Sequence, residues 1–292
     1  MTKMIVTHIH PDLDAIMSSW LLVRFDQSRF GDAKFEFVPA PTTYKNLPPD
    51  NDPDIVHTDV GGGKFDHHKP GGFATCASKL IWEELIAQGL VSPTDMALKT
   101  MVEIALEIDT FADCYWPGTD SPRMAFMLHE IIPALHRLQT HDNEAVLRMV
   151  FVYLDGVYQR LKDWEKGRDA VNEGEEFESA WGRGIIVTTA ADDVSKIAQK
   201  MGYEIVVISD NVHGHLKIKT APGVELPLKS LYDKIALCED SERWVYHNSG
   251  HMLFSGSDKG ELRERTTLHV SDILEMISTT IKDGVDKEGG VI

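Results

Sequence analysis

Residues 3–14 read KMIVTHIHPDLD, a strand pattern that turns directly into a helix pattern. Three consecutive apolar residues, Met4, Ile5 and Val6, are typical of a strand buried on both faces of a sheet. Pro11 ends the strand, and apolar residues then recur at helical spacing. A buried strand followed at once by a helix predicts the first unit of a parallel sheet.

The alternation of strand and helix patterns continues along the chain. Further strands are predicted over residues 35–38, 55–60, 184–189, 204–209, 213–220, 243–247 and 252–255. Helices are predicted over residues 77–88, 94–111, 120–139, 143–171, 192–200 and 269–281. The acidic, glycine-containing stretch 172–178 predicts a domain boundary. We therefore expect an α/β protein, with a doubly wound, mostly parallel sheet in residues 1–178 and a smaller C-terminal α/β domain in residues 179–292.

Composition restricts the partners and the compartment. The chain has 292 residues and a net charge of −17, which would repel long duplex nucleic acid. No apolar run approaches the roughly 20 residues that cross a bilayer, so we expect no membrane association. The first residues turn polar before a signal-peptide core could form, and the three cysteines are scattered. These features predict a cytoplasmic protein with reduced thiols.

Four short motifs carry residue types that bind metals. Their candidate ligands are His8, Asp12, Asp14, Asp59, His67 and Asp109. Each motif alone has an ordinary explanation, because Asp12 or Asp14 could cap the following helix and Asp59 could be a turn residue. Together, four carboxylates would repel one another, and two divalent ions would neutralise them. Oxygen ligands with some imidazole favour Mn²⁺, with Mg²⁺, Co²⁺, Fe²⁺ or Zn²⁺ as alternatives.

The order of these motifs resembles the DHH phosphoesterase superfamily, which includes RecJ-type exonucleases and nanoRNases. The matching stretches are residues 8–14, Asp59, residues 66–68 and residues 109–110. The resemblance implies one metal held by His8, Asp12 and Asp59. It implies a second metal held by Asp14, Asp59, His67 and Asp109. It also implies that Asp59 bridges the metals, that His68 faces the substrate phosphate, and that Asp66 supports the histidines.

The second half of the chain carries a further stretch of this kind. Residues 247–256, HNSGHMLFSG, are similar to the GGHxxAAG motif of the DHH-associated C-terminal domain. The resemblance implies a substrate-binding role for His247, Ser249, Gly250 and His251. An ordinary β-hairpin turn is the alternative. Residues 59–69 also resemble the melanocyte-proliferating-gene exonuclease branch, although residues 8–14 depart from its FHxDE pattern.

The sequence therefore predicts a metal-dependent phosphoesterase that uses Asp59, His68 and a metal-activated water. Its acidic surface favours a small phosphate compound, a nucleotide or a short oligonucleotide over long duplex nucleic acid. The sequence is compatible with a homodimer but does not decide the oligomeric state. One alternative is a metallo-β-lactamase-like hydrolase, since residues 7–12 partly match THxHxDH, although Leu13 replaces a ligand. Another alternative is a non-catalytic nucleotide-binding sensor on the same fold.

Overall fold

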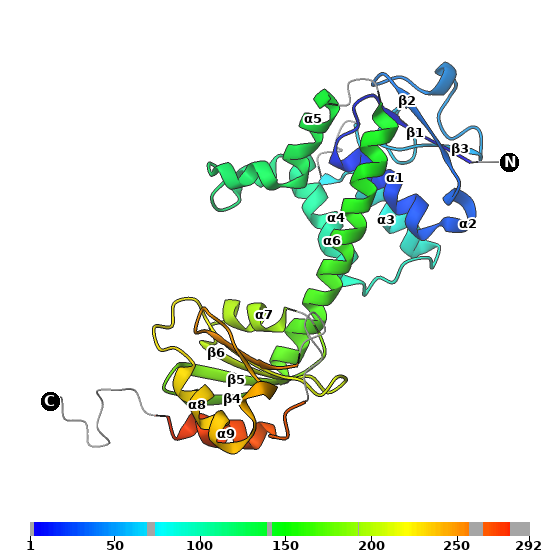
Figure 1. Ribbon diagram of the computed structural model, residues 1–292. Helices are drawn as coiled ribbons and strands as arrows, with labels where there is room; N and C mark the ends of the chain where they lie inside the picture. Colours follow the sequence, from blue (N-terminus) through cyan, green and yellow to red (C-terminus); the bar gives the residue numbers. More distant parts are fainter. Residues whose placement is uncertain (1–2, 69–73, 139–141, 192, 257–264, 281–292) are drawn as a thin grey trace. The chain divides into compact units, whose positions relative to one another are not determined.

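The computed structural model describes residues 3–68, 74–138, 142–191, 193–256 and 265–280 (Figure 1). It divides into two compact units, Met1–Arg160 and Leu161–Ile292. The division lies inside helix α6 (Asn143–Asn172), which continues without a break. The sequence places the boundary at residues 178–179 instead. The acidic stretch before that point forms strand β4 (Glu175–Ser179), which pairs in the sheet of the second unit.

The first unit is built on a three-stranded parallel sheet. Its strands are β1 (Met4–His8), β2 (Lys34–Val38) and β3 (Ile55–His57), in the order β2-β1-β3. Ile5 and Val6 of the central strand are fully buried, as the apolar run predicts. The chain is therefore mixed α/β, and the doubly wound form remains a prediction. Because β1 and β3 run parallel, their carboxyl ends meet at one edge of the sheet.

Helix α1 is the buried centre of the first unit. The helices of this unit before α6 are α1 (Leu13–Phe25), α2 (Gln27–Phe30), α3 (Ala77–Ala87), α4 (Met96–Asp109) and α5 (Leu128–Leu138). Short 3₁₀ segments are η1 (Tyr44–Asn46), η3 (Ala112–Tyr115) and η4 (Pro122–Phe126). Residues 13–22 of α1 are all buried, and the helix packs against α3 and α4. A helix buried on all sides holds the residues at its N-terminus firmly.

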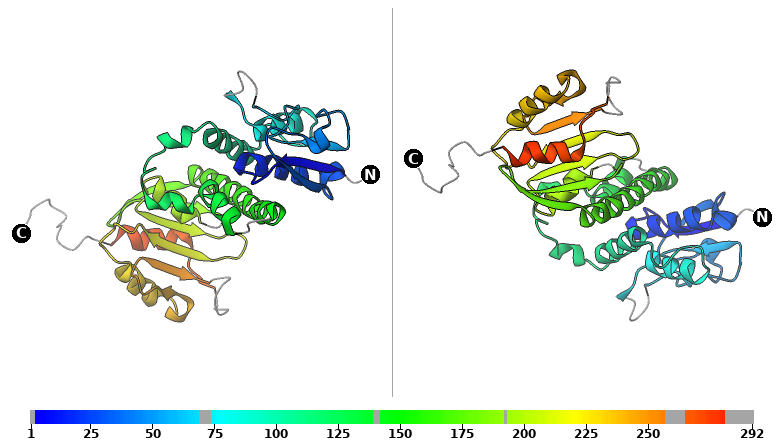
Figure 2. Two further views of the ribbon diagram at one scale, coloured as in Figure 1. Left: turned by 90° about the horizontal axis from the view of Figure 1, so that it is seen from above. Right: turned by 90° about the horizontal axis from the view of Figure 1, so that it is seen from below.

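The second unit is a three-layer α/β structure. Its mixed sheet has the order β4-β5-β6-β7-β9-β8. The remaining strands are β5 (Gly182–Thr188), β6 (Ile205–Ser209), β7 (Leu216–Thr220), β8 (Val245–Tyr246) and β9 (Met252–Ser255). Helix α7 (Val194–Lys200) and the end of α6 cover one face. Helices α8 (Lys229–Cys238) and α9 (Val270–Ser278) cover the other (Figures 1 and 2).

The two faces of this sheet separate by the alternation of side chains along its strands. In β6, Ile205 and Val207 pack against α8 and α9, whereas Val206 and Ile208 pack against α7. Both sets are buried, which explains why the sequence of β6 is an unbroken apolar run.

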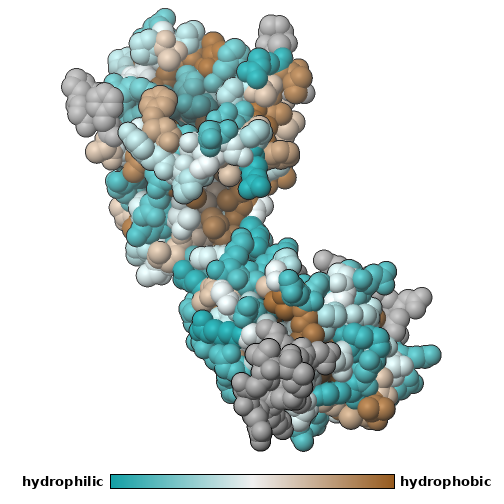
Figure 3. Space-filling model, turned by 90° about the vertical axis from the view of Figure 1, so that its left-hand side faces the viewer, coloured by the Kyte–Doolittle hydropathy of each residue, from teal (hydrophilic) through white to brown (hydrophobic). Residues whose placement is uncertain are grey.

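The surface mixes hydrophilic residues with smaller hydrophobic areas (Figure 3). Among the described residues, no helix combines the length with the apolar composition that crossing a bilayer requires. A further short 3₁₀ segment, η5 (Ser241–Arg243), precedes β8.

Candidate metal centre

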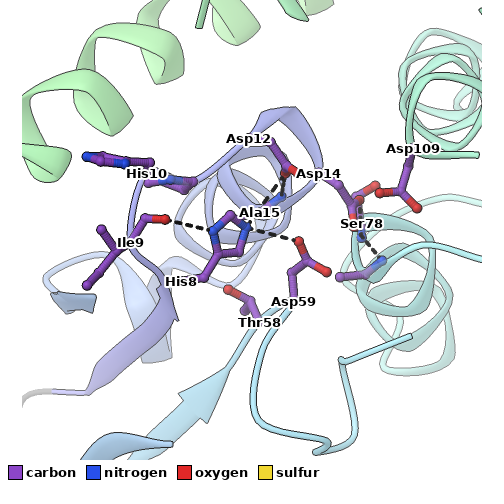
Figure 4. Close-up of polar contacts among 12 residues, drawn as sticks. His8, Ile9, His10, Asp12, Asp14, Ala15, Thr58, Asp59, Ser78 and Asp109 are labelled. Carbon is purple, nitrogen blue, oxygen red and sulfur yellow. Dashed lines mark hydrogen bonds and ion pairs between the residues drawn. The ribbon is translucent and has the colours of Figure 1, made fainter. Parts of the chain in front are cut away.

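The candidate ligands gather at the edge of the first sheet where β1 and β3 end. His8 is the last residue of β1, and Asp59 lies two residues beyond the end of β3. Asp12 and Asp14 lie at the N-terminus of α1, and Asp109 is the last residue of α4. Figure 4 shows these five side chains together at this edge. Strand ends and helix ends therefore bring together residues that lie far apart in the sequence.

The first group consists of His8, Asp12 and Asp59, whose ligand atoms all lie within 4.8 Å of one another. His8 Nε2 is 3.4 Å from Asp59 Oδ2 and 3.9 Å from Asp12 Oδ1. Asp12 also caps α1, because its Oδ1 accepts a hydrogen bond from Ala15 N at 3.1 Å. The helix-cap role and a ligand role are compatible, since a carboxylate has several lone pairs.

The second group consists of Asp14, His67 and Asp109. His67 Nε2 is 3.4 Å from Asp109 Oδ2 and 4.0 Å from Asp14 Oδ2. The same nitrogen is 3.2 Å from Asp59 Oδ1. Asp59 therefore approaches His8 with one carboxylate oxygen and His67 with the other. A third group, Asp59, His67 and His68, shares one residue with each of the other two, so all six candidate ligands lie in one connected cluster.

Three buried atoms of this cluster lack a hydrogen-bond partner in the described part of the chain. They are Asp59 Oδ1, His67 Nε2 and Asp109 Oδ2. Buried polar atoms are normally paired, because leaving one unpaired costs about 1–3 kcal/mol. Their contacts converge on His67, and a cation there would satisfy all three. Four carboxylates and two imidazoles form a donor set that fits divalent cations.

The cluster shifts the protonation of its own histidines. Burial lowers the pKa of His8, but Asp59 and Asp12 outweigh it and raise that pKa to about 9. The adjacent Asp59 carboxylate raises the pKa of His67 to about 9 against the effect of burial. Burial opposes ionisation of Asp59, yet His67 and His8 hold the pKa of Asp59 below its usual range. In the metal-free protein these imidazoles carry protons in place of cations.

The pKa values of Asp14 and Asp109 shift in the opposite direction from the pKa of Asp59. Burial, with the charge of Asp59 added, raises the pKa of Asp14 to about 7. Burial also raises the pKa of Asp109 to about 6, although His67 counteracts it. Metal ligands must be deprotonated, so a cation would displace protons from both histidines and carboxylates of this cluster.

Asp14 has a second role that the sequence does not predict. Its Oδ2 accepts from Ala77 N at 2.7 Å, and its Oδ1 accepts from Ser78 N at 2.9 Å. These N–H groups belong to the first turn of α3, whose N-cap residue Cys76 makes no side-chain cap. Asp14 thus caps a helix 63 positions away. No local sequence signal marks such a long-range cap.

Asp66 organises the turn that carries the adjacent histidines. Its carboxylate accepts hydrogen bonds from the backbone N–H groups of Gly62 and His68. His68 Nδ1 lies 2.9 Å from Asp66 Oδ1. Gly61 and Gly62 have φ of 83° and 73°, a left-handed backbone that favours glycine. These interactions with Asp66 hold His68 in place, although the His68 side chain is 63% exposed.

A cleft of about 1280 Å³ opens beside these residues, and all of its walls belong to the first unit. His67, His68 and Asp109 line one part of it, next to both groups of candidate ligands. The C-terminal end of α4 and helix α5 line the rest, with Phe111 and Arg137 among the side chains. This volume exceeds what a single phosphate needs and suits an organic substrate. No pattern in the sequence identifies the α5 side of the cleft.

His10 lies apart from both groups of candidate ligands. Its backbone N–H donates to Asn143 Oδ1 at 3.0 Å, and its ring packs against the ring of His136 at 5.2 Å. In Figure 4 the His10 side chain lies to the side of the cluster. None of the three metal-ligand groups found among the described residues includes His10.

The predicted substrate-binding residues of the second half lie in the turn of the β8–β9 hairpin. His247 Nδ1 is 2.9 Å from Ser249 Oγ, and His251 Nδ1 is 2.8 Å from Thr220 Oγ1. Gly250 has φ of 76°, and an added Cβ would lie 3.2 Å from Tyr246 Oη. These residues belong to the second unit and do not line the cleft beside the candidate ligands. The hairpin alternative thus describes their local structure correctly.

No family model and no curated protein matches this sequence. Among solved structures, the chain is similar to RecJ from Thermus thermophilus, crystallised in complex with Mg²⁺. The two share 17% identity with a TM-score of 0.26, and the match covers 88% of this chain and 47% of the RecJ chain. The chain spans about half the length of that protein. The functional conclusion therefore rests on the side chains of the site.

Proposed function

We propose that this protein is a divalent-metal-dependent phosphoesterase of the DHH superfamily. The observation that carries the proposal is the position of Asp59, which lies 3.4 Å from His8 Nε2 through one oxygen and 3.2 Å from His67 Nε2 through the other. A carboxylate shared between two ligand groups suits a pair of cations a few ångströms apart, the arrangement of many phosphoester-cleaving sites. The order of the four motifs in the sequence supports the same superfamily.

The residues divide between two cation positions. We assign the first to His8, Asp12 and Asp59, and the second to Asp14, Asp59, His67 and Asp109. Bound divalent cations, with Mn²⁺ as the first candidate, would supply positive charge for phosphoryl oxygens and a water of lowered pKa. Asp59 lies between the positions, where its carboxylate would accept a hydrogen bond from the attacking water.

His68 is assigned to the substrate phosphate. Its ring lines the cleft with Asp66 at Nδ1, and Nε2 would donate to a phosphoryl oxygen in the form of the ring that carries hydrogen on both nitrogens. Asp66 is a positioning residue, because its carboxylate at Nδ1 fixes the orientation of the ring.

The proposed substrate is a phosphate ester or phosphodiester of a nucleotide or a short oligonucleotide. The volume of the cleft and the net charge of −17 favour such a compound over long duplex. In the second unit, we assign substrate contacts to His247, Ser249, Gly250 and His251. His247 and Ser249 present an exposed imidazole and an exposed hydroxyl group, which are groups that contact phosphate oxygens.

The metallo-β-lactamase-like alternative requires His10 as a ligand, and its ring packs on His136 instead. The sensor alternative predicts that the protein binds a nucleotide without turnover. The two remaining hypotheses therefore differ in a single observable, the hydrolysis of a phosphoester.

The test is a panel of phosphoesters with Mn²⁺, comparing wild type with Asp59→Asn and Asp26→Asn. The panel contains a chromogenic phosphodiester, pyrophosphate, short RNA and DNA oligomers and cyclic dinucleotides. Asp26 is a matched control, because it is equally buried at 2% exposure but its carboxylate hydrogen-bonds to the Ser28 and Arg29 side chains, away from the ligand groups. We expect D59N to lose turnover by at least about 100-fold, the loss typical of a shared electrostatic group, and D26N to retain it.

Undiminished turnover in D59N would contradict the proposal. Metal binding without hydrolysis of any member of the panel would favour the sensor. A protein that binds no divalent cation at all would contradict the proposed metal centre.

A further inference from the structure

Phe111 is an exposed aromatic residue at the edge of the candidate metal centre. It lies two positions beyond Asp109, directly after the Thr110 C-cap of α4. Its side chain is 80% exposed. It lines the same cleft as His67, His68 and Asp109.

The backbone at Phe111 is unfavourable for a phenylalanine. Its φ of 60° and ψ of 18° are left-handed, and its N–H donates to Ile108 O as in a helix C-terminal turn. Glycine or asparagine normally occupies this position, because a Cβ with a bulky ring is strained there. The choice of residue therefore opposes the local backbone preference.

Packing does not explain the residue either. A ring that is 80% exposed contributes little to a hydrophobic core. Strained residues that bring no packing gain tend to occur at ligand sites, where the side chain acts on something bound. The cleft that Phe111 lines is the place where that ligand would bind.

The cleft supplies an apolar environment for a planar group. Ile108 on the same helix end, and Ile132 and Pro133 of α5, line it together with Phe111. The two-residue step from Asp109 to Phe111 spans at most about 7 Å of backbone. The ring and the Asp109 carboxylate therefore extend from the same end of α4 and line the same cleft.

We propose that the Phe111 ring is the platform on which a base of the substrate stacks while its phosphate lies at the candidate metal centre. The inference rests on the proposed phosphoesterase function and assigns its substrate to compounds that carry a base next to the scissile phosphate. Stacking on an aromatic ring accepts every base, so the platform favours nucleotides as a class without selecting a sequence.

The test compares two probes with three variants in the full-length protein with Mn²⁺. The probes are a 5′-phosphorylated adenine dinucleotide and an analogue with abasic sugars in place of both nucleosides. The variants are Phe111→Gly, Phe111→Trp and the control Phe126→Ala. Phe126 is a matched control because it is 86% exposed, belongs to the same unit and does not line the cleft.

We expect F111G to raise KM for the dinucleotide on the order of tenfold and to leave KM for the abasic analogue unchanged. F111W and F126A should retain the preference for the dinucleotide. Because glycine relieves the left-handed strain, F111G should melt at the same temperature as wild type or higher. A purely structural role would lower the melting temperature instead.

Two results would overturn the inference while the proposed function stands. One is an F111G variant that keeps the preference for the base-bearing probe, and the other is an F111G variant that unfolds at lower temperature. If wild type hydrolyses neither probe, equilibrium binding of both is measured with Ca²⁺ in place of Mn²⁺. Equal binding of the two probes then overturns the inference, and tighter binding of the dinucleotide that F111G abolishes supports it without turnover.

Discussion

Asp59 combines an unusual backbone with an unusual charge environment. Its φ of 57° is left-handed, which an aspartate tolerates better than most residues. The backbone N–H of Asp59 donates to Phe65 O at 2.9 Å, which ties this residue to the far end of the turn of residues 61–64. Its carboxylate is 1% exposed between two imidazoles. Local strain and a buried charge at one position together mark Asp59 as the central residue of the site.

Substitution of Asp66 tests whether a positioning residue can be separated from the ligands. In Asp66→Asn, the amide loses the charge that holds His68 Nδ1. We expect kcat to fall about 10- to 100-fold, because the ring that contacts the phosphate loses its orientation. Mn²⁺ affinity, measured by calorimetry, should fall less than kcat, since Asp66 belongs to none of the three ligand groups found among the described residues. A parallel loss of Mn²⁺ affinity would mean that Asp66 serves the ligands instead of His68.

At the level of elements, the junction of α1 with α3 links the site to the stability of the fold. Asp14 joins the N-terminus of α1 to that of α3 through Ala77 N and Ser78 N. A carboxylate at the N-terminus of a helix also interacts favourably with the helix dipole. The residue proposed as a metal ligand is therefore also the cap of a packed helix.

This double role predicts that Asp14→Ala and Asp14→Asn differ in stability. Both variants remove a buried charge whose pKa is raised to about 7, but only alanine leaves both N–H groups of α3 without an acceptor. In the metal-free protein at pH 8, Asp14→Ala should therefore have a free energy of unfolding about 1–3 kcal/mol below that of Asp14→Asn. Urea denaturation with a chelator measures both. Equal changes in the two variants would show that the cap on α3 contributes nothing.

The sequence predicts elements well where the pattern is apolar and poorly where it is charged. Strand β6 and helix α6 follow from their apolar patterns, with observed bounds of Ile205–Ser209 and Asn143–Asn172. The sequence of β4 predicts a boundary instead of a strand, because β4 is an acidic edge strand in which Phe177 packs on Gly184. No pattern predicts helix α8, and α5 begins only at Leu128, because residues 122–126 form a 3₁₀ segment.

The candidate site, like the secondary structure, is predicted only in part from the sequence, but for a different physical reason. Residues at the ends of β1 and β3 could be identified because parallel strands end at one edge of a sheet. The cap that Asp14 provides for α3 is a tertiary contact, which no local pattern encodes, and a phenylalanine does not signal a left-handed backbone.

At the scale of the whole molecule, the cluster makes stability depend on pH in a direction that metal should reverse. His8 and His67 have pKa values raised to about 9, above the value of about 6.5 expected in the unfolded chain. The folded metal-free protein therefore binds more protons than the unfolded chain between these values. Its free energy of unfolding should then decrease as pH rises from about 6.5 towards 9. The raised pKa values of Asp14 and Asp109 act in the same direction at lower pH, between about 4 and 7.

Bound cations replace those protons, so metal binding strengthens with pH and adds stability in proportion. Urea denaturation at pH 6.5, 7.5 and 8.5 measures this dependence. With chelator, the free energy of unfolding should fall by a few kcal/mol in total as the pH rises, whereas with Mn²⁺ it should stay constant or increase. A His8→Gln, His67→Gln double variant is the control, because it removes both raised histidine pKa values and should flatten the chelator series. If the free energy of unfolding changes with pH in the same way with and without Mn²⁺, the cation does not bind at these histidines. Opposite slopes that the double variant abolishes would connect metal uptake, proton release and folding to the same two side chains.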